Sequence, residues 1–185
     1  MEEYAYILDY MPQGLPGTSF AKRGPICYAV GEEEFKLFEL VPKKDAKISI
    51  EDRVYIGREG KDKPPREEID HVKRRVSYNE LTGTAQTELD YIVQTLVKKN
   101  EDKYVSFFNN AGPINIKKHL LEELPGMGKK TLEEFLKERR AGKFESFEDI
   151  TKRVPILKTP EKLIKDRIML EITDDERRRY IFISK

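Results

Sequence analysis

A tight glycine turn between two helical patterns constrains the fold of this chain more than any other feature. The turn occupies residues 124–131 and has the sequence Leu-Pro-Gly-Met-Gly-Lys-Lys-Thr. Apolar residues at the spacing of one helix face precede and follow it: Ile116, Leu120 and Leu124 before, and Leu132, Phe135 and Leu136 after. Pro125 and Gly126 end the first helix, because proline lacks an N–H group and glycine accepts a positive φ. The sequence therefore predicts a helical hairpin.

The same turn has the properties of a phosphate-binding site. Gly128 lets the backbone enter a second helix, whose first amides have no partner within the helix. A helix N-terminus attracts anions, and Lys129 and Lys130 add positive charge beside it. Because amides contact phosphate and not base edges, such a site binds nucleic acid of any sequence. The residues expected to make the contact are Gly126, Met127, Gly128, Lys129, Lys130 and Thr131.

The turn resembles the helix-hairpin-helix motif, whose usual core is Leu-Pro-Gly-(apolar)-Gly-x-Lys-Thr-Ala. The match runs through Thr131 and departs at Leu132, where the motif prefers a small residue for close helix packing. An alternative is a hairpin that only joins two core helices, a role that degenerate copies of the motif have. Both glycines and both lysines are present here, which favours the nucleic-acid interpretation.

A faint internal repeat predicts a second hairpin. Apolar residues at helical spacing precede Pro155, as they precede Pro125. The second turn lacks both glycines, and Ile156 and Leu157 stand where the first turn has Gly-Met. We therefore expect a packing copy, in which Ile156 and Leu157 point into the interface between the two helix pairs.

The first 76 residues favour strands. Short apolar segments separated by glycine and proline occupy residues 4–10, 27–31, 35–41, 47–57 and 69–76. Such spacing predicts a small OB-type barrel. The expected fold class is α+β: an OB-like β-barrel over 1–76, a helical bridge over 77–112, an all-helical tandem helix-hairpin-helix domain over 113–173 and a C-terminal strand within 174–185.

The charge balance limits how the chain can bind nucleic acid. Charged residues make up 37% of the chain, but the formal net charge is only +1, so any affinity must come from local patches. The densest cluster in the barrel half is Lys73, Arg74 and Arg75. On a strand, Lys73 and Arg75 share one face and Arg74 takes the other. The cluster is either a positive track along a barrel groove that continues to the hairpin, or a solvated edge strand.

Several classes of site are not expected. Cys27 is the only cysteine, and His71 and His119 are the only histidines, so neither a metal site nor a histidine-based triad is predicted. No cofactor is expected. The chain lacks a signal-peptide pattern and an apolar run of membrane length, which predicts a cytoplasmic protein without membrane partners.

The wider pattern resembles an archaeal family of uncharacterised proteins described as RNA-binding. The resemblance spans nearly the whole chain and rests on four segments, at residues 70–75, 107–109, 124–130 and 144–150. It implies an OB-like barrel followed by a helix-hairpin-helix domain, and it assigns no activity. Genes of this family often adjoin translation and rRNA-modification genes, which implies RNA in preference to DNA and a ribosomal or rRNA-processing partner.

Non-catalytic nucleic-acid binding is therefore the expected function, with two alternatives. The first is a DNA glycosylase/lyase, because in enzymes of that class the lysine at the position of Lys130 attacks the sugar and an aspartate at about the spacing of Asp149 assists. The strand-rich first half and a capping box that accounts for Asp149 rank this below the binder. The second is a protein-docking adaptor of the translation machinery.

Overall fold

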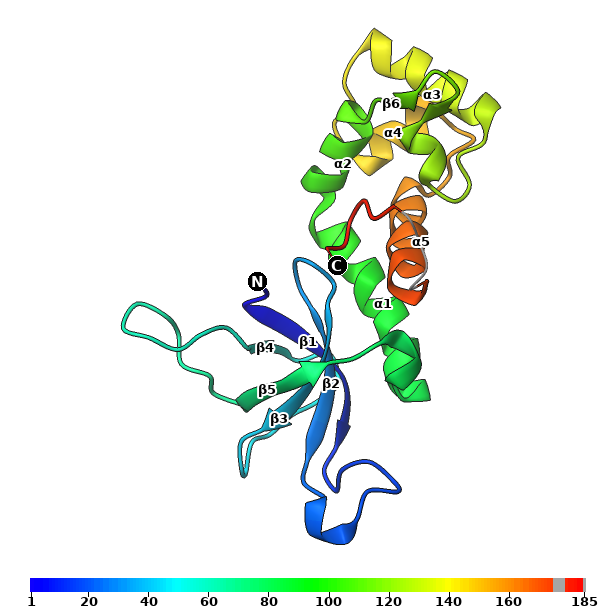
Figure 1. Ribbon diagram of the computed structural model, residues 1–185. Coiled ribbons are helices and arrows are strands. Elements are labelled where there is room, and N and C mark those ends of the chain that lie inside the picture. Colours follow the sequence, from blue (N-terminus) through cyan, green and yellow to red (C-terminus); the bar gives the residue numbers. More distant parts are fainter. Residues whose placement is uncertain (175–178, 185) are drawn as a thin grey trace. The chain divides into compact units, whose positions relative to one another are not determined.

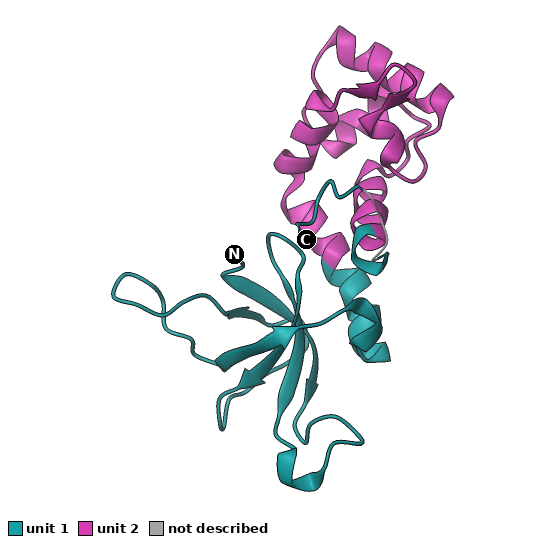
Figure 2. Cartoon of the chain, viewed as in Figure 1, with its two compact units in different colours: residues 1–92, 171–185 teal, residues 93–170 magenta. Residues whose placement is uncertain are grey.

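The computed structural model describes residues 1–174 and 179–184, which divide into two compact units (Figures 1 and 2). The first unit comprises residues 1–92 and the described residues from 171 onward. The second unit comprises residues 93–170. Helix α1 (Gly83–Lys99) begins in the first unit, and helix α5 (Pro160–Thr173) begins in the second.

A curled five-stranded antiparallel sheet forms the first unit. Its strands are β1 (Tyr4–Met11), β2 (Ile26–Gly31), β3 (Leu37–Pro42), β4 (Arg53–Tyr55) and β5 (Ile69–Arg75). The strand order is β4-β1-β2-β3-β5, so β4 and β5 are the edges of a half-barrel. The predicted strand segments are confirmed in part: residues 47–52 form a loop and a turn, and residues 35–36, 56–57 and 76 also lie outside the strands.

One apolar core lies inside this curl. It draws residues from every strand and from the position after β4: Ala5, Ile7, Cys27, Ala29, Phe38, Leu40, Val54, Ile56 and Ile69. Cys27 is fully buried, and burial raises the pKa of its thiol to about 12, with a smaller contribution from the Asp9 carboxylate. The thiol is therefore a core residue without nucleophilic character.

The side chain of Arg66 bridges the two edge strands. Its Nε donates to the Gly57 carbonyl at 2.8 Å, and its Nη2 donates to the Ile56 carbonyl at 3.0 Å, both just after β4. Its Nη1 donates to the Asp70 carbonyl in β5 at 3.2 Å. A planar guanidinium can satisfy three carbonyls at once, so Arg66 holds the open side of the curl together.

The second unit is mainly helical. Besides the adjoining parts of α1 and α5 it contains α2 (Glu101–Asn110), α3 (Lys129–Ala141) and α4 (Phe147–Arg153). A small hairpin of β6 (Pro113–Asn115) and β7 (Lys118–His119) follows α2, and a 3-10 turn (Leu120–Glu123) follows the hairpin. Packed rings form its centre, with centroids 5.5 Å apart for Phe108 and Phe135 and 4.8 Å apart for Phe135 and Phe144.

Two predicted elements are wrong. The helix expected before the glycine turn is replaced by the β6–β7 hairpin and the short 3-10 turn, because Asn115 Oδ1 accepts the Lys117 amide at 2.8 Å and fixes a turn there. Residues 179–184 do not form the predicted C-terminal strand: residues 181–183 form bends, and the others have no regular structure. Residues 175–178 and 185, which share that prediction, lie outside the described residues.

Candidate nucleic-acid interface

The glycine turn has a backbone conformation that few residues other than glycine adopt. Gly126 has a φ of +98°, and the Met127 amide closes the turn by donating to the Leu124 carbonyl at 3.0 Å. Leu124 and Met127 are buried, so the turn is anchored from below. A Cβ added at Gly126 would come no nearer than 3.8 Å to Leu163, which means that φ and not crowding imposes glycine at this position.

Helix α3 begins immediately after this turn with unpartnered amides. Gly128 is its N-cap, and no side chain caps it. Within the described part of the chain, no hydrogen bond is formed by the backbone amides of Lys129, Lys130 and Thr131. A Cβ added at Gly128 would meet no atom within 4 Å, so the approach to these amides is open. The result is an exposed helix N-terminus of the kind that binds anions.

The six residues expected at the site have different roles in the structure. Lys129 and Lys130 are exposed beside the amides, and Gly126 and Gly128 are exposed in the turn. The Met127 side chain is buried, and its backbone amide donates to the hydrogen bond that closes the turn. The Thr131 side chain is also buried. The surface offered to a ligand is therefore two glycines, two lysines and backbone amides.

A basic surface that sequence reasoning missed lies beside the turn. An open hollow of about 630 Å³ is lined by Asn115, Ile116, Lys117, Lys118, Glu122 and Lys129. It joins the tip of the β6–β7 hairpin to the start of α3. The hairpin was not predicted because Ile116, Leu120 and Leu124 have the spacing of a helix face. The turn-forming residues Gly112, Pro113 and Asn115 were the signal that could have indicated it.

The second turn confirms one expectation and contradicts another. Leu157 is buried, with 3% of its surface exposed, and its amide donates to the Val154 carbonyl at 2.9 Å. Ile156 is 60% exposed, so the prediction that it points into a helix interface is wrong. Ile156 occupies the position of exposed Gly126, whereas Leu157 occupies the position of buried Met127. In both turns the first residue after the proline is exposed and the second is buried.

The basic strand is divided by a β-bulge. In the β3–β5 register, Glu39 faces Arg74 and Leu40 faces Val72, which leaves Lys73 as the extra residue. Lys73 Nζ and Arg74 Nε therefore both reach the buried Glu39 carboxylate, at 2.9 and 2.8 Å. The alternation expected for a regular strand does not hold here, and much of this positive charge is neutralised.

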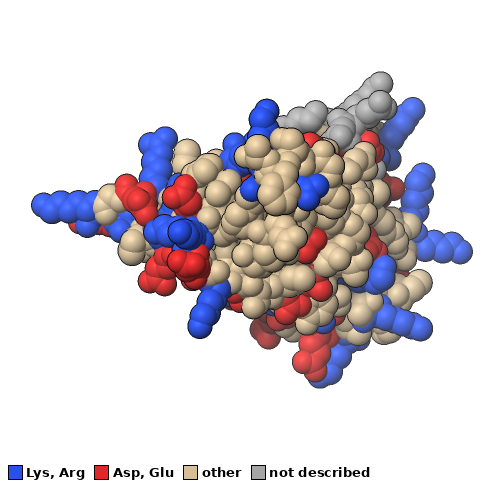
Figure 3. All heavy atoms as spheres, turned by 90° about the horizontal axis from the view of Figure 1, so that it is seen from below, with Lys and Arg blue, Asp and Glu red and all other residues tan. Residues whose placement is uncertain are grey.

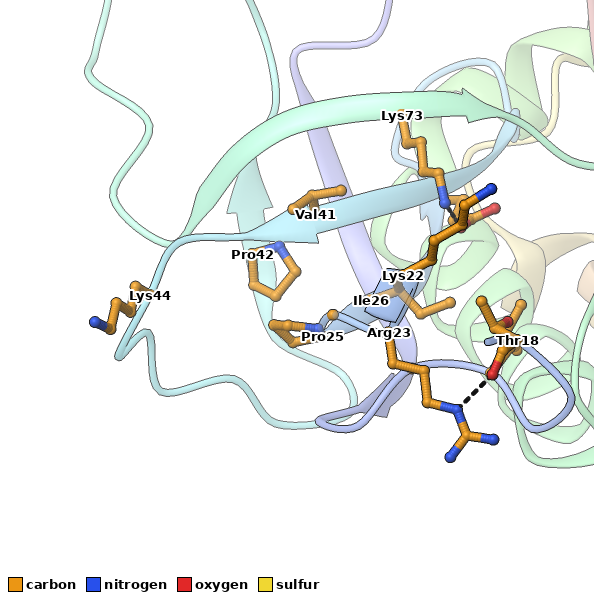
Figure 4. A pocket seen from close by; sticks show the side chains of 13 residues that line it. Thr18, Lys22, Arg23, Pro25, Ile26, Val41, Pro42, Lys44 and Lys73 are labelled. Carbon is orange, nitrogen blue, oxygen red and sulfur yellow. Dashed lines mark hydrogen bonds and ion pairs between the residues drawn. The ribbon is translucent and has the colours of Figure 1, made fainter. Parts of the chain in front are cut away.

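Lys73 and Arg75 consequently line different hollows of the first unit. Figure 4 shows the hollow of about 350 Å³ that Lys73 enters from β5; Pro25, Ile26 and Val41 line it, and Lys44 points away. Arg75 lines a second hollow of about 510 Å³, together with Lys36, Arg58, Arg66 and the apolar residues Phe38, Ile56 and Val72. Basic and acidic side chains are interspersed on the face drawn in Figure 3.

The lyase alternative involves Lys130 and Asp149, and Asp149 has hydrogen-bond and ion-pair partners. Asp149 Oδ2 accepts the Glu145 amide at 3.0 Å and pairs with Arg153 Nη1 at 3.3 Å. The Asp149 amide donates to Ser146 Oγ at 2.9 Å, which confirms the cap at the start of α4. Lys130 is exposed, whereas a lysine nucleophile acts from a desolvated pocket.

Both histidines have other partners. His71 Nδ1 lies 2.6 Å from Asp70 Oδ2 on the surface. His119 Nδ1 accepts the Leu121 amide at 3.1 Å, so this histidine caps the 3-10 turn. Across residues 1–174 and 179–184, no three His, Cys, Asp or Glu residues are arranged to hold a metal ion. Over the same residues, none of the helices combines the length and apolarity needed to cross a membrane.

Known proteins resemble this chain along its whole length. A family model described as "Protein of unknown function (DUF655)" matches residues 1–184. The uncharacterised protein MJ0038 of Methanocaldococcus jannaschii is 42% identical over 184 residues, which cover 100% of this chain and 80% of that protein. The crystal structure of the DUF655 protein Af1531 from Archaeoglobus fulgidus has a TM-score of 0.89 at 42% identity, with 99% of this chain and 100% of that chain covered. The chain therefore belongs to the DUF655 family, and both of these relatives are archaeal.

Proposed function

We propose that this protein binds the phosphate backbone of nucleic acid through the N-terminus of α3, without catalysis and without sequence specificity. The observation that carries the proposal is the set of amides at Lys129, Lys130 and Thr131, which are unpartnered among the described residues and approached past a glycine with no neighbour. Exposed Lys129 and Lys130 supply the charge that complements phosphate. Together these features suit a helix-hairpin-helix motif whose first helix is reduced to a 3-10 turn.

The architecture of the first unit supports an OB-like barrel in this proposal. The order β4-β1-β2-β3-β5 becomes a closed five-stranded ring if β5 and β4 are counted as neighbours. Arg66 already connects the backbone after β4 to β5. Small barrels of this kind bind oligonucleotides on their sheet face. Lys73 and Arg75 would then act as secondary contacts, weakened at Lys73 by its pairing with Glu39.

RNA is the proposed ligand in preference to DNA, inside the cytoplasm and in the company of ribosomal or rRNA-processing factors. The support for this choice is the family resemblance and its gene neighbours, because a phosphate contact does not itself distinguish the two nucleic acids. The adaptor alternative has no comparable geometric support. The lyase alternative requires Asp149 to assist catalysis, but the Asp149 carboxylate already accepts the Glu145 amide and pairs with Arg153.

The experiment that tests the proposal measures affinity for RNA and for DNA of matched sequence over a series of salt concentrations. Because phosphate contacts release counterions, the logarithm of the association constant should fall linearly with the logarithm of salt concentration, with a slope of about −0.7 to −0.9 per contacted phosphate. Scrambling the sequence should leave the affinity nearly unchanged.

A variant that adds a single methyl group at the site tests whether phosphate approaches the α3 amides. Gly128→Ala meets no protein atom and requires no positive φ, so it should lower the melting temperature only slightly, through the weaker N-cap preference of Ala. Its Cβ stands where phosphate would approach, and we expect roughly tenfold weaker binding, equal to about 1.4 kcal/mol. Binding that is independent of salt, or absent for RNA and DNA alike, would refute the proposed function.

A further inference from the structure

An isolated aliphatic side chain projects from the second unit beside the proposed phosphate site. Ile116 is the tip of the β6–β7 hairpin and has a relative exposure of 106%, the largest among the exposed large hydrophobic residues of the described chain. Full exposure leaves an isoleucine without the favourable free energy that burial of an apolar side chain provides. A single exposed apolar side chain is common on protein surfaces, so the residues around Ile116 must decide whether it has a ligand.

The tip that carries Ile116 is held firmly. Asn115 Oδ1 accepts the Lys117 amide at 2.8 Å within the tip, and the Leu120 amide donates to the Gly112 carbonyl at 3.0 Å at its base. Lys118 Nζ pairs with Glu123 at 2.8 Å, and this pairing is the first cause of the lowered pKa of the Glu123 carboxyl. Contacts at both ends of the hairpin therefore fix the direction in which Ile116 points.

Buried Arg167 extends this support from below. Its Nη1 lies 3.0 Å from Glu123 Oε2 and 3.1 Å from the Glu123 carbonyl. The hairpin is thus tied through Glu123 to α5, the helix that packs under the first turn through Leu163. A hairpin held in this way suits a side chain that inserts between groups of a ligand, because the hairpin loses little conformational entropy on binding.

The surroundings of Ile116 identify the chemistry of the partner. Lys117, Lys118 and Lys129 line its hollow, although Lys118 is paired with Glu123. The one acidic side chain of the lining, Glu122, accepts the His119 amide at 2.7 Å and keeps its negative charge, so the lining carries more positive than negative charge. A broad apolar patch would indicate a protein partner, whereas one aliphatic tip among cations complements a stacked, negatively charged polymer. Proteins that unstack nucleic acid insert such apolar wedges between base steps while cations hold the flanking phosphates.

We propose that Ile116 is a wedge that inserts between bases of the bound nucleic acid while the N-terminus of α3 holds the adjacent phosphate. This inference rests on the proposed function and adds substrate class to it: the protein prefers structured RNA with an already unstacked step, such as a single-nucleotide bulge, to a perfect duplex. The preference follows because unstacking a base step costs more free energy in an intact duplex than at a bulge, where the step is already disrupted.

The test uses two RNA duplexes of the same flanking sequence, one perfect and one with a single-nucleotide bulge, each carrying 2-aminopurine beside the bulge position. The wild-type protein should bind the bulged duplex about tenfold more tightly and raise the 2-aminopurine fluorescence, which reports unstacking. Ile116→Ala should bring the two affinities to within about twofold and abolish the fluorescence increase, with an unchanged salt slope. Ile156→Ala, the matched exposed isoleucine on the second turn, should behave as wild type.

The outcomes separate this inference from the function on which it rests. If the wild-type protein binds neither RNA nor DNA, the proposed function fails and the wedge fails with it. If the wild type binds with a steep salt dependence but Ile116→Ala retains the preference and the fluorescence change, the wedge alone is overturned. Equal weakening of both duplexes by Ile116→Ala also overturns it, because that result describes a plain contact.

Discussion

The two turns of the second unit follow the same backbone scheme but offer different surfaces to solvent. In each, a buried aliphatic residue precedes proline, and an amide three residues later closes the turn at 3.0 Å in the first and 2.9 Å in the second. The two turns differ at the residue that follows the proline, where Gly126 has a φ of +98° and Ile156 has no positive φ. The comparison teaches that the same turn can pack against the core in both copies, while the residues after the proline determine whether the N-terminus of the following helix is accessible.

The start of the following helix completes the difference. Lys158 stands where the first turn has Gly128, and Pro160 opens α5 without an amide to donate. Helix α3 instead opens with Lys129, Lys130 and three unpartnered amides, as far as the described residues extend. Anion binding is therefore expected at the first turn alone.

The largest expected effect on binding is the loss of affinity when the two lysines of the first turn are removed. Lys129→Ala combined with Lys130→Ala should weaken RNA binding about 100-fold, about 2.7 kcal/mol, and should reduce the salt slope by about 2. Both side chains are exposed, so the thermal melt should not change. Fluorescence anisotropy at several salt concentrations measures both quantities.

Lys158→Ala is the matched control, because Lys158 is exposed on the second turn. It should leave the affinity and the salt slope at their wild-type values. If Lys158→Ala weakens binding and the double variant at the first turn is silent, the roles of the two turns are the reverse of those assigned here.

The second effect separates the two apolar residues of the packing turn. Leu157→Ala should lower the free energy of unfolding by about 2–4 kcal/mol, because it leaves a cavity beneath the turn. Ile156→Ala and Ile156→Asp should each change it by less than about 0.5 kcal/mol, since the side chain is exposed. Urea unfolding followed by circular dichroism measures these differences. A large cost for Ile156→Asp would restore the interface position that the structure contradicts.

A smaller effect concerns the two glycines of the first turn. Gly126→Ala should lower the free energy of unfolding by about 1–2 kcal/mol, because a Cβ is strained at a φ of +98°. Gly128→Ala should cost less, about 0.5 kcal/mol, since its φ is negative and its surroundings are open, and the remaining cost reflects that Ala is a poorer N-cap than Gly. The same urea titrations test this pair, and equal costs at both positions would mean that φ is not what distinguishes the two glycines.

How much of this molecule was predictable depends on whether the deciding signal is local. The strands of the first unit follow from short apolar runs bounded by glycine and proline, and the cap at Ser146 follows from its spacing to Asp149. The glycine turn and the start of α3 were predictable in the same way, because Gly-Met-Gly-Lys-Lys specifies both the turn and the charge. The five strands and the unpartnered α3 amides therefore needed no tertiary information.

The remainder depends on contacts between residues distant in sequence. The bulge at Lys73 exists only in the register of β5 against β3, and the bridge by Arg66 requires β4 and β5 to face each other. Ile116, Leu120 and Leu124 satisfy a helical period, but the turn held by Asn115 competes successfully with that helix. A hydrophobic period alone could not reveal the outcome of that competition.

The smallest expected effect is a pH dependence that belongs to the first turn and has no counterpart in the second. His119 caps the 3-10 turn that leads into residues 124–131, and its Nδ1 must be unprotonated to accept the Leu121 amide. Burial lowers the pKa of His119, and the neighbouring Arg139 guanidinium lowers it further, against a small opposing effect of Glu122. The native state therefore binds the proton less readily than the unfolded state does.

The direction of the stability change follows from this difference. Above the ordinary histidine pKa of about 6.5 both states are neutral and His119 has no effect. As pH falls through that value the unfolded state takes up the proton first, so the free energy of unfolding decreases until the native pKa is also passed. His119→Asn retains an oxygen that can cap the turn without titrating, and it should flatten the change in urea midpoint between pH 7.5 and pH 5.5. His71→Asn, which removes an exposed histidine, is the control; a slope that persists in His119→Asn would show that another group governs acid stability.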